Sequence, residues 1–297
     1  MGEVVVADYA SMGKIGVWTG LRQWPDDPSA RKEAGAELES LGFASLWIGG
    51  SSGQFPVIDD VLGATSRLVA ATGIIQIWAN PARAVAAEHH RLTTKHPGRF
   101  LLGLGVGHAP AVEAAGQRYE RPLDKLTSYL DELDAAEHPV PSSERVIAAL
   151  RPKALAVAAT RAAGAHPYNV SPEHTAKARV LLGPSALLIP EQKVFIDADA
   201  STSRDVARQA MARYLELPNY VNNLRELGFD DDDFADGGSD RFLDTMVVWG
   251  SATTIAMRVR AHLDAGANQV VVQLLSATEG GDLPRAGWRQ AAEMLLG

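Results

Sequence analysis

The sequence contains no cysteine in its 297 residues. This absence excludes disulfide bonds, thiolate nucleophiles, iron–sulfur clusters and cysteine-ligated zinc sites. The chain also lacks any run that approaches the ~20 uninterrupted apolar residues of a membrane-spanning helix. Basic residues are in the minority, with 28 lysines and arginines against 36 aspartates and glutamates. The resulting net charge of −8 argues against a protein that binds nucleic acid. Residues 1–11 contain no basic segment, so we expect no signal peptide and a cytoplasmic protein.

What the sequence does have is a regular alternation of short apolar runs with amphipathic helical segments. The predicted strands are residues 15–18, 44–48, 74–78, 100–104, 146–149, 164–166, 193–196 and 270–274. Strands that alternate with helices in this way indicate parallel pairing and an α/β protein. We predict a (β/α)8 TIM barrel that forms one domain over residues 1–297. An open doubly wound sheet is the alternative, but no strand here is followed by the G-x-G-x-x-G turn that favours it.

One segment interrupts the alternation, at residues 218–245, between the seventh and eighth predicted strands. It contains four consecutive aspartates, Asp230 to Asp233, which superficially suggest a calcium loop. The alternating ligands and terminal glutamate of such loops are missing. We therefore expect a solvated insertion within the barrel domain.

The loops that follow the strands carry the candidate chemistry, because active sites of such barrels lie at the C-terminal ends of the strands. After the fourth strand, Gly103, Gly105 and Gly107 alternate and His108 follows. Glycines at alternate positions leave one side of the chain bare, where a flat ring system could approach the backbone. His108 could give or take a proton near neutral pH. A glycine-rich bend with a surface histidine is the plain alternative.

Aromatic and imidazole side chains end other predicted strands. Trp18 and Trp78 close two different strands and could line one substrate pocket, to which His166 would also belong. The alternatives are packing for the tryptophans and a hydrogen bond to a backbone carbonyl for His166. The adjacent residues 88–91, Glu-His-His-Arg, point to different sides of a predicted helix, so we expect no metal site. The helix starts near residues 150–153 and 169–171 could bind phosphate through free N–H groups.

The run Gly-Arg-Phe-Leu-Leu-Gly-Leu-Gly-Val-Gly-His-Ala-Pro at residues 98–110 resembles the fourth strand of luciferase-like monooxygenases. It is most similar to their branch that uses the deazaflavin coenzyme F420. Residues 41–47, 71–74, 164–168 and 171–174 also fit, so the resemblance covers nearly the whole chain. It implies an oxidoreductase that moves a hydride between F420 and a small organic substrate. Two alternatives are an FMN-dependent monooxygenase that uses reduced flavin and oxygen, and a catalytically silent barrel that binds a flavin-like ligand.

The resemblance also implies where such a coenzyme binds. The residues expected around its ring are Gly49, Ile75, Gln76, Val106, Gly107 and Ala149. Those expected near its phosphate and tail are Leu150, Arg151, Tyr168 and Asn169. Family members often have a cis peptide bond behind the ring, and the candidate bond here is Ile75–Gln76, within one residue. They are also often dimeric, so we expect a homodimer.

The resemblance implies one catalytic group and one departure from the family pattern. His108 occupies the position from which relatives direct an acid or base at the substrate. Many relatives have Asp, Glu or His after the second strand, where this chain has Gly49 and Gly50. His108 is therefore the main candidate for proton transfer, and the substrate is not predicted.

Overall fold

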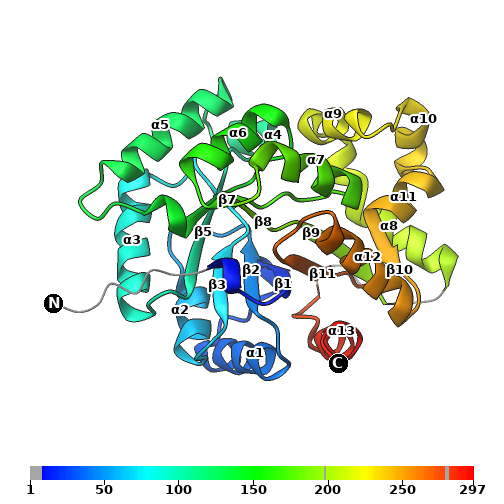
Figure 1. Ribbon diagram of the computed structural model, residues 1–297, viewed down its shortest axis with the longest axis horizontal. Helices are drawn as coiled ribbons and strands as arrows, with labels where there is room; N and C mark the ends of the chain where they lie inside the picture. The colour runs from blue at the N-terminus through cyan, green and yellow to red at the C-terminus, as the bar shows by residue number, and fades with distance from the viewer. Residues whose placement is uncertain (1–8, 197–198, 278–280) are drawn as a thin grey trace.

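The computed structural model describes residues 9–196, 199–277 and 281–297, and its centre is a curled sheet of parallel strands (Figure 1). The strands are β1 (Ile15–Gly20), β2 (Ser45–Gly49), β3 (Val69–Thr72), β4 (Ile75–Gln76), β5 (Phe100–Gly105), β6 (Arg145–Ile147), β7 (Gly164–Ala165), β8 (Leu187–Leu188), β9 (Glu191–Phe195), β10 (Val247–Trp249) and β11 (Val270–Leu274). Their order in the sheet is β10-β9-β11-β1-β2-β3-β5-β6-β7-β8, and β4 pairs with β5.

The ring of strands closes through β8 and β9, which are two parts of one extended segment. β8 pairs with β7, with Leu187 opposite Gly164. β9 pairs with β11, with Glu191 opposite Val271, and β11 pairs with β1. The change of partner occurs next to Pro190, whose nitrogen cannot donate to a ladder. The predicted (β/α)8 barrel is therefore confirmed, with residues 187–195 as its seventh strand and β11 as its eighth.

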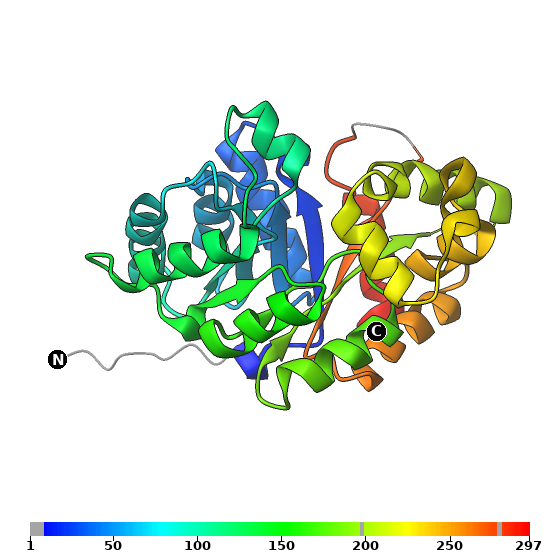
Figure 2. The same ribbon diagram turned by 90° about the horizontal axis from the view of Figure 1, so that it is seen from above.

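Helices surround the strands (Figures 1 and 2). They are α1 (Pro28–Ser40), α2 (Pro56–Gly63), α3 (Ala82–Lys95), α4 (Ala109–Ala114), α5 (Pro122–Asp134), α6 (Pro152–Arg161), α7 (Pro172–Leu182), α8 (Ala200–Leu215), α9 (Pro218–Glu226), α10 (Asp231–Phe234), α11 (Asp240–Met246), α12 (Ala252–Asp264) and α13 (Arg285–Leu295). Several begin with proline, whose missing N–H costs nothing in the first turn. Among the described residues, no helix is long and apolar enough to cross a membrane.

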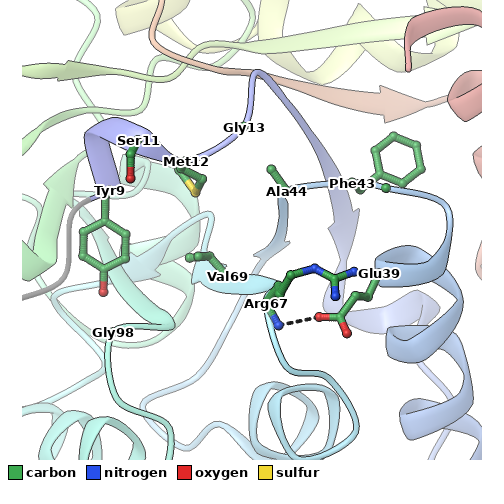
Figure 3. Close-up of a pocket in the computed structure, with 11 residues that line it drawn as sticks. Tyr9, Ser11, Met12, Gly13, Glu39, Phe43, Ala44, Arg67, Val69 and Gly98 are labelled. Carbon is green, nitrogen blue, oxygen red and sulfur yellow. Dashed lines mark hydrogen bonds between the residues drawn. The ribbon is translucent and has the colours of Figure 1, made fainter. Parts of the chain in front are cut away.

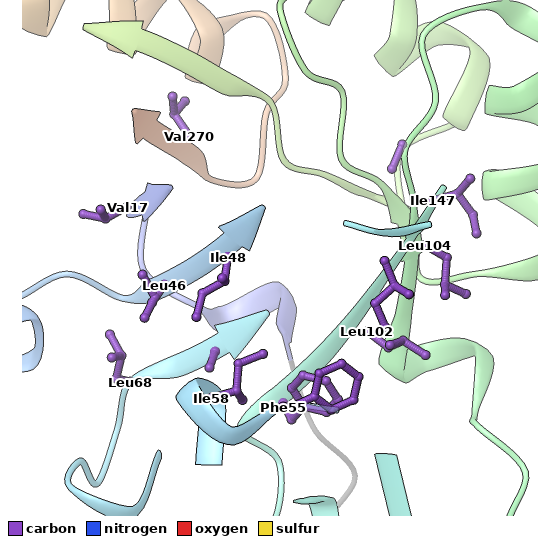
Figure 4. Close-up of a cluster of buried hydrophobic side chains, with 14 of the residues drawn as sticks. Val17, Leu46, Ile48, Phe55, Ile58, Leu68, Leu102, Leu104, Ile147 and Val270 are labelled. Atoms are coloured by element: carbon purple, nitrogen blue, oxygen red, sulfur yellow. The ribbon is translucent and has the colours of Figure 1, made fainter. Parts of the chain in front are cut away.

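The hydrophobic core has two layers because successive residues of a strand point to opposite sides of the sheet. In β2, Leu46 and Ile48 pack outward with helix residues such as Ile58 (Figure 4). Between them, Trp47 faces the barrel interior in a cluster that includes Leu101. The strands thus hold the helices on one face and fill the barrel on the other.

The third strand lies earlier in the chain than predicted. β3 spans Val69–Thr72 and not residues 74–78, because α2 already ends at Gly63, which leaves Leu68 to the connection and Val69 to the sheet. A cis peptide bond joins Gly73 to Ile74, directly after β3. The prediction that placed this bond at Ile75–Gln76, within one residue, is therefore wrong by two positions.

Residues 218–245 are folded and not the solvated segment that we expected. Together with α8 they form a helical lobe beside the barrel, coloured from yellow-green to gold in Figure 2. The lobe has its own core, which includes Met211, Leu224 and Phe242. The carboxylate of Asp230 accepts hydrogen bonds from the first N–H groups of α10, so the run of aspartates starts a helix.

Candidate active site

The alternating glycines of β5 lie against the segment that carries the cis peptide bond. A Cβ atom at Gly103 would lie 1.9 Å from the carbonyl oxygen of Thr72, and one at Gly105 would lie 2.8 Å from Cδ1 of Ile74. A Cβ at Gly107 would meet the side chain of Gln76 at 2.6 Å. The surface that we expected to be bare is therefore covered, and a ligand at this end of the barrel would meet Ile74 and Gln76.

His108 stands at the end of this segment, at the N-cap position of α4. It is half-buried, and its ring centroid lies 5.5 Å from that of Tyr220 in the lobe. Burial, followed by the nearby charge of Arg213, lowers the pKa of His108 below 6.5, although a hydrogen bond with Asn219 opposes this shift. The imidazole is therefore neutral near pH 7, and its Nδ1 has no hydrogen-bond partner among the described residues.

Trp18 explains why glycine follows the second strand. A Cβ atom at Gly49 would lie 1.9 Å from the Trp18 indole, so no larger side chain fits there. The indole Nε1 donates to the carbonyl oxygen of Gly73 at 3.1 Å, and the ring lies 5.3 Å from that of Tyr168. Gly49 is itself buried under Trp18, so a ligand would contact the indole before it reached Gly49.

Tyr168 connects the barrel to the lobe. Its hydroxyl donates to Oε1 of Gln273 in β11 at 2.7 Å and accepts from the hydroxyl of Tyr214 in α8 at 3.2 Å. The rings of Tyr214 and Tyr220 are 5.0 Å apart. Burial, followed by neighbouring Tyr214 and Glu191, raises the pKa of Tyr168, so its phenol stays protonated. A continuous series of aromatic rings thus runs from Trp18 to His108 across this end of the barrel.

Asn169 lies beside a buried ion pair that the sequence interpretation missed. Glu191 and Lys193 of β9 are 1% and 2% exposed, with their charged atoms 3.1 Å apart. Lys193 also donates to Oδ1 of Asn169. The sequence does contain a signal for this ion pair, because two opposite charges at alternate positions of a strand must lie on one face of the sheet.

His166 is enclosed in the barrel and does not line an open pocket. It is 1% exposed and stacks on Trp47 at 4.2 Å. Its Nδ1 lies 2.7 Å from the carbonyl oxygen of Ile189, which fixes the neutral ring with its proton on Nδ1. Burial lowers the pKa of His166 to about 4. Its Nε2 has no partner among the described residues and lies toward Gly73.

The structure does not bring Trp78 to Trp18. Trp78 donates to the carbonyl oxygen of Val106 at 2.7 Å and packs with the outer core. Trp18 packs with the interior cluster instead. The prediction of one pocket lined by both indoles is therefore not supported, and only Trp18 lies over the barrel interior.

The other residues predicted to contact the coenzyme differ in which of their atoms a ligand could reach. The side chains of Ile75 and Ala149 are buried in the outer core, which leaves only their backbone to a ligand. The carbonyl oxygen of Leu150 lies 2.7 Å from Nε2 of His174 and accepts a hydrogen bond from it when Nε2 is protonated. Arg151 is exposed and pairs with Glu226 of the lobe at 2.8 Å, just before α6 begins.

Among the described residues, several buried side-chain polar atoms have no hydrogen-bond partner. Four of them belong to residues that follow β5 or β7 in the chain, namely His108 Nδ1, His166 Nε2, Asn169 Nδ2 and His174 Nδ1. Buried polar atoms are normally hydrogen-bonded, so such a group fits a site that a polar ligand completes. Within residues 9–196, 199–277 and 281–297 no group of three or more metal-binding side chains occurs.

The opposite end of the barrel holds a pocket of about 350 Å³. It is lined by Gly13, Ala44 and Val69, which lie at the N-terminal ends of the first three strands (Figure 3). The Glu39 carboxylate at its edge accepts hydrogen bonds from the backbone N–H groups of residues 66–68. This end of such barrels serves stability, so we place the candidate active site at the other end.

Comparison with known proteins identifies the family. The model of the luciferase-like monooxygenases matches residues 8–269. The chain belongs to this family. A comparison with curated protein sequences gave no match.

Solved structures of low sequence identity share this luciferase-like fold. An F420-dependent secondary alcohol dehydrogenase in complex with an F420–acetone adduct is 14% identical, with a TM-score of 0.72 over 95% of this chain and 98% of that one. The coenzyme F420-dependent tetrahydromethanopterin reductase of Methanopyrus kandleri is 15% identical, with a TM-score of 0.73 over 96% and 99%. The oxygenating constituent of 3,6-diketocamphane monooxygenase of Pseudomonas putida, in complex with FMN, is 13% identical, with a TM-score of 0.66 over 95% and 96%.

Proposed function

We propose that this luciferase-like protein is an oxidoreductase that uses the deazaflavin coenzyme F420 to transfer a hydride to or from a small organic substrate. The observation that carries this proposal is the set of buried polar atoms after β5 and β7 that have no partner among the described residues, which includes Nδ1 of the neutral His108. The resemblance of residues 98–110 to the F420-using branch supports the choice of coenzyme.

The residues at this end of the barrel fit a flat ring with a polar tail. Trp18, Ile74 and Gln76 present partly exposed side chains beside the cis peptide bond, and Tyr168 and Asn169 lie on the neighbouring side of the ring of strands. When bound, the coenzyme supplies a ring carbon that accepts or releases a hydride. The protein binds and orients the two reactants and provides the proton partner.

His108 is the proton partner in this proposal. A neutral imidazole with an unpartnered nitrogen is ready to act as a base. In the oxidation of an alcohol, His108 takes the proton from the substrate oxygen while the hydride leaves the adjacent carbon. In the reverse direction, the protonated imidazole returns that proton to the carbonyl oxygen.

An FMN-dependent monooxygenase is the second candidate, because the fold also occurs in a monooxygenase in complex with FMN. The two reactions differ in their need for dioxygen. The protein should be incubated with a panel of alcohols and either oxidised F420 or reduced FMN, each with and without dioxygen, while the F420 absorption and the loss of substrate are followed. We expect F420 to be reduced equally in both atmospheres. Turnover that occurs only with reduced FMN and dioxygen would overturn the proposal in favour of the second candidate.

A further inference from the structure

The ion pair in β9 is an unusual feature of a barrel interior. Glu191 and Lys193 are almost fully buried, with Oε1 and Nζ 3.1 Å apart. The loss of hydration of two such charges commonly exceeds what their attraction returns, so an apolar pair of similar size is often at least as stable. Stability alone therefore does not account for this pair.

Both charges of the pair hold the same residue, Asn169, in the loop that leaves β7. Oε2 of Glu191 accepts a hydrogen bond from the backbone N–H of Asn169 at 3.1 Å. Nζ of Lys193 donates to its side-chain oxygen at 2.5 Å. Asn169 has a left-handed backbone conformation with φ of 55°, which asparagine tolerates better than most residues.

This arrangement fixes the orientation of the Asn169 amide. An ammonium group has only donors, so it must face the amide oxygen and not the amide nitrogen. Nδ2 therefore faces away from Lys193, where it has no hydrogen-bond partner among the described residues. Asn169 is 3% exposed, so bulk water does not satisfy this donor.

The same lysine also contacts the neighbouring residue of the site. Nζ of Lys193 lies 3.9 Å from the centroid of the Tyr168 ring, a distance at which a cation is attracted to an aromatic face. Tyr168 is partly exposed and lies against Trp18. Lys193 thus contacts the Tyr168 ring, whereas Asn169 is the residue to which both charges of the pair are hydrogen-bonded.

We propose that Glu191 and Lys193 are positioning residues, which hold Asn169 so that its Nδ2–H group donates a hydrogen bond to an oxygen atom of the bound coenzyme. This inference rests on the proposed function, because it assigns a role within the same site. In this proposal Asn169 binds the coenzyme through its side-chain nitrogen, and the buried charges serve to orient Asn169.

The first test is the affinity of Asn169→Ala for F420, measured by the change in coenzyme fluorescence. We expect the dissociation constant to rise about tenfold or more, because the variant loses a buried donor. Gln192→Met is the matched control, because Gln192 lies between the two charges in β9 but its amide nitrogen bonds to backbone carbonyls, including that of Met246. The control should bind F420 as the wild type does, even if it is less stable.

The second test replaces both charges at once, as Glu191→Gln with Lys193→Met, because removal of only one would leave an unpaired buried charge. We expect F420 to bind about tenfold more weakly while the midpoint of thermal unfolding changes by only about a few degrees. In the Asn169→Ala background the same two replacements should weaken binding less than about twofold, since the pair acts through Asn169.

The outcomes separate the inference from the proposed function. If the wild type binds F420 and Asn169→Ala binds it equally well, the inference is wrong and the proposed function stands. If the effects of the pair and of Asn169→Ala multiply, the pair does not act through Asn169 and its positioning role is wrong. If the wild type binds no F420, both the proposed function and this inference are overturned.

Discussion

His108 is the residue on which the proposed chemistry depends most. It contacts the lobe through Tyr220 and Asn219, while its Nδ1 has no hydrogen-bond partner in the part of the chain that the structure describes. Replacement of His108 by alanine should lower kcat about 100-fold or more, because general acid–base catalysis is typically of that size. Affinity for F420 should change little and serves as the control. Normal turnover by this variant would remove His108 from the mechanism.

The pKa of His108 gives a prediction of its own. A base must be unprotonated, so kcat/KM should fall on the acid side only below pH 6.5, since the pKa is lowered. Arg213→Gln removes a repelling positive charge, so the pKa should rise and the acid limb should move to higher pH. Asn219→Ala removes a hydrogen bond that favours the charged ring, so the limb should move to lower pH.

These two variants are controls for each other, because both lie in the lobe near the same ring. The comparison is made on pH profiles of kcat/KM, which report the free enzyme. Shifts in the same direction for both variants, or no shift in either, would mean that another group controls the acid limb.

The alternating glycines of β5 allow this strand to pack closely against its neighbours. Gly103→Ala places a methyl group 1.9 Å from the carbonyl oxygen of Thr72, so the strands must separate. We expect a loss of about 2 kcal/mol or more in the free energy of unfolding. Gly63→Ala, at the end of α2, meets no atom within 4 Å and should stabilise the protein by up to about 1 kcal/mol.

Urea unfolding of both alanine variants measures the difference. The same chemical change should therefore act with opposite signs at the two positions. A Gly103→Ala protein as stable as the wild type would show that β5 can move away from Thr72. Close packing would then not explain the glycine, and a role in ligand binding would.

Most strands could be predicted from the sequence because β-branched runs alternate with helical periodicity. The third strand could not, because Leu68 and Val69 continue the apolar spacing of α2, and only the end of that helix at Gly63 leaves Val69 free to begin the strand. The position of the cis peptide bond depended on this boundary. The helical lobe was also missed, because the run from Asp230 to Asp233 suggested solvated chain.

The candidate site could be predicted only in part. The end of β5 and His108 could be predicted, because glycine spacing and a titratable side chain are visible in the sequence. Contacts between distant segments were not, such as Trp18 over Gly49 or Lys193 against Asn169. Such pairs depend on how neighbouring strands are staggered in the barrel, which periodicity does not specify.

Buried neutral histidines make the stability of the folded protein depend on pH. Burial lowers the pKa of His166 to about 4 and that of His262 to about 3. Below pH 6.5 the unfolded chain takes up protons that the folded chain does not, so stability falls as the pH decreases from 6.5 toward 4. For His166 the loss is at most roughly 3 kcal/mol, at 1.36 kcal/mol for each pH unit.

The free energy of unfolding in urea at pH 7 and at pH 4.5 measures this effect. The His166→Gln variant, which cannot titrate at that position, should lose less stability between the two pH values than the wild type. Glu39 titrates in a different range, since its pKa is lowered to about 2 and its contribution is lost only below about pH 4.5. An unchanged pH dependence in His166→Gln would show that the ring is protonated in the folded protein.

The proposed function requires that the C-terminal end of this barrel, with the lobe beside it, binds a deazaflavin. The most direct measurement is a fluorescence titration of the wild-type protein with F420 and, separately, with FMN. We expect saturable binding of F420 that is tighter than that of FMN and is weakened by Asn169→Ala. Tight binding of FMN without binding of F420 would contradict it.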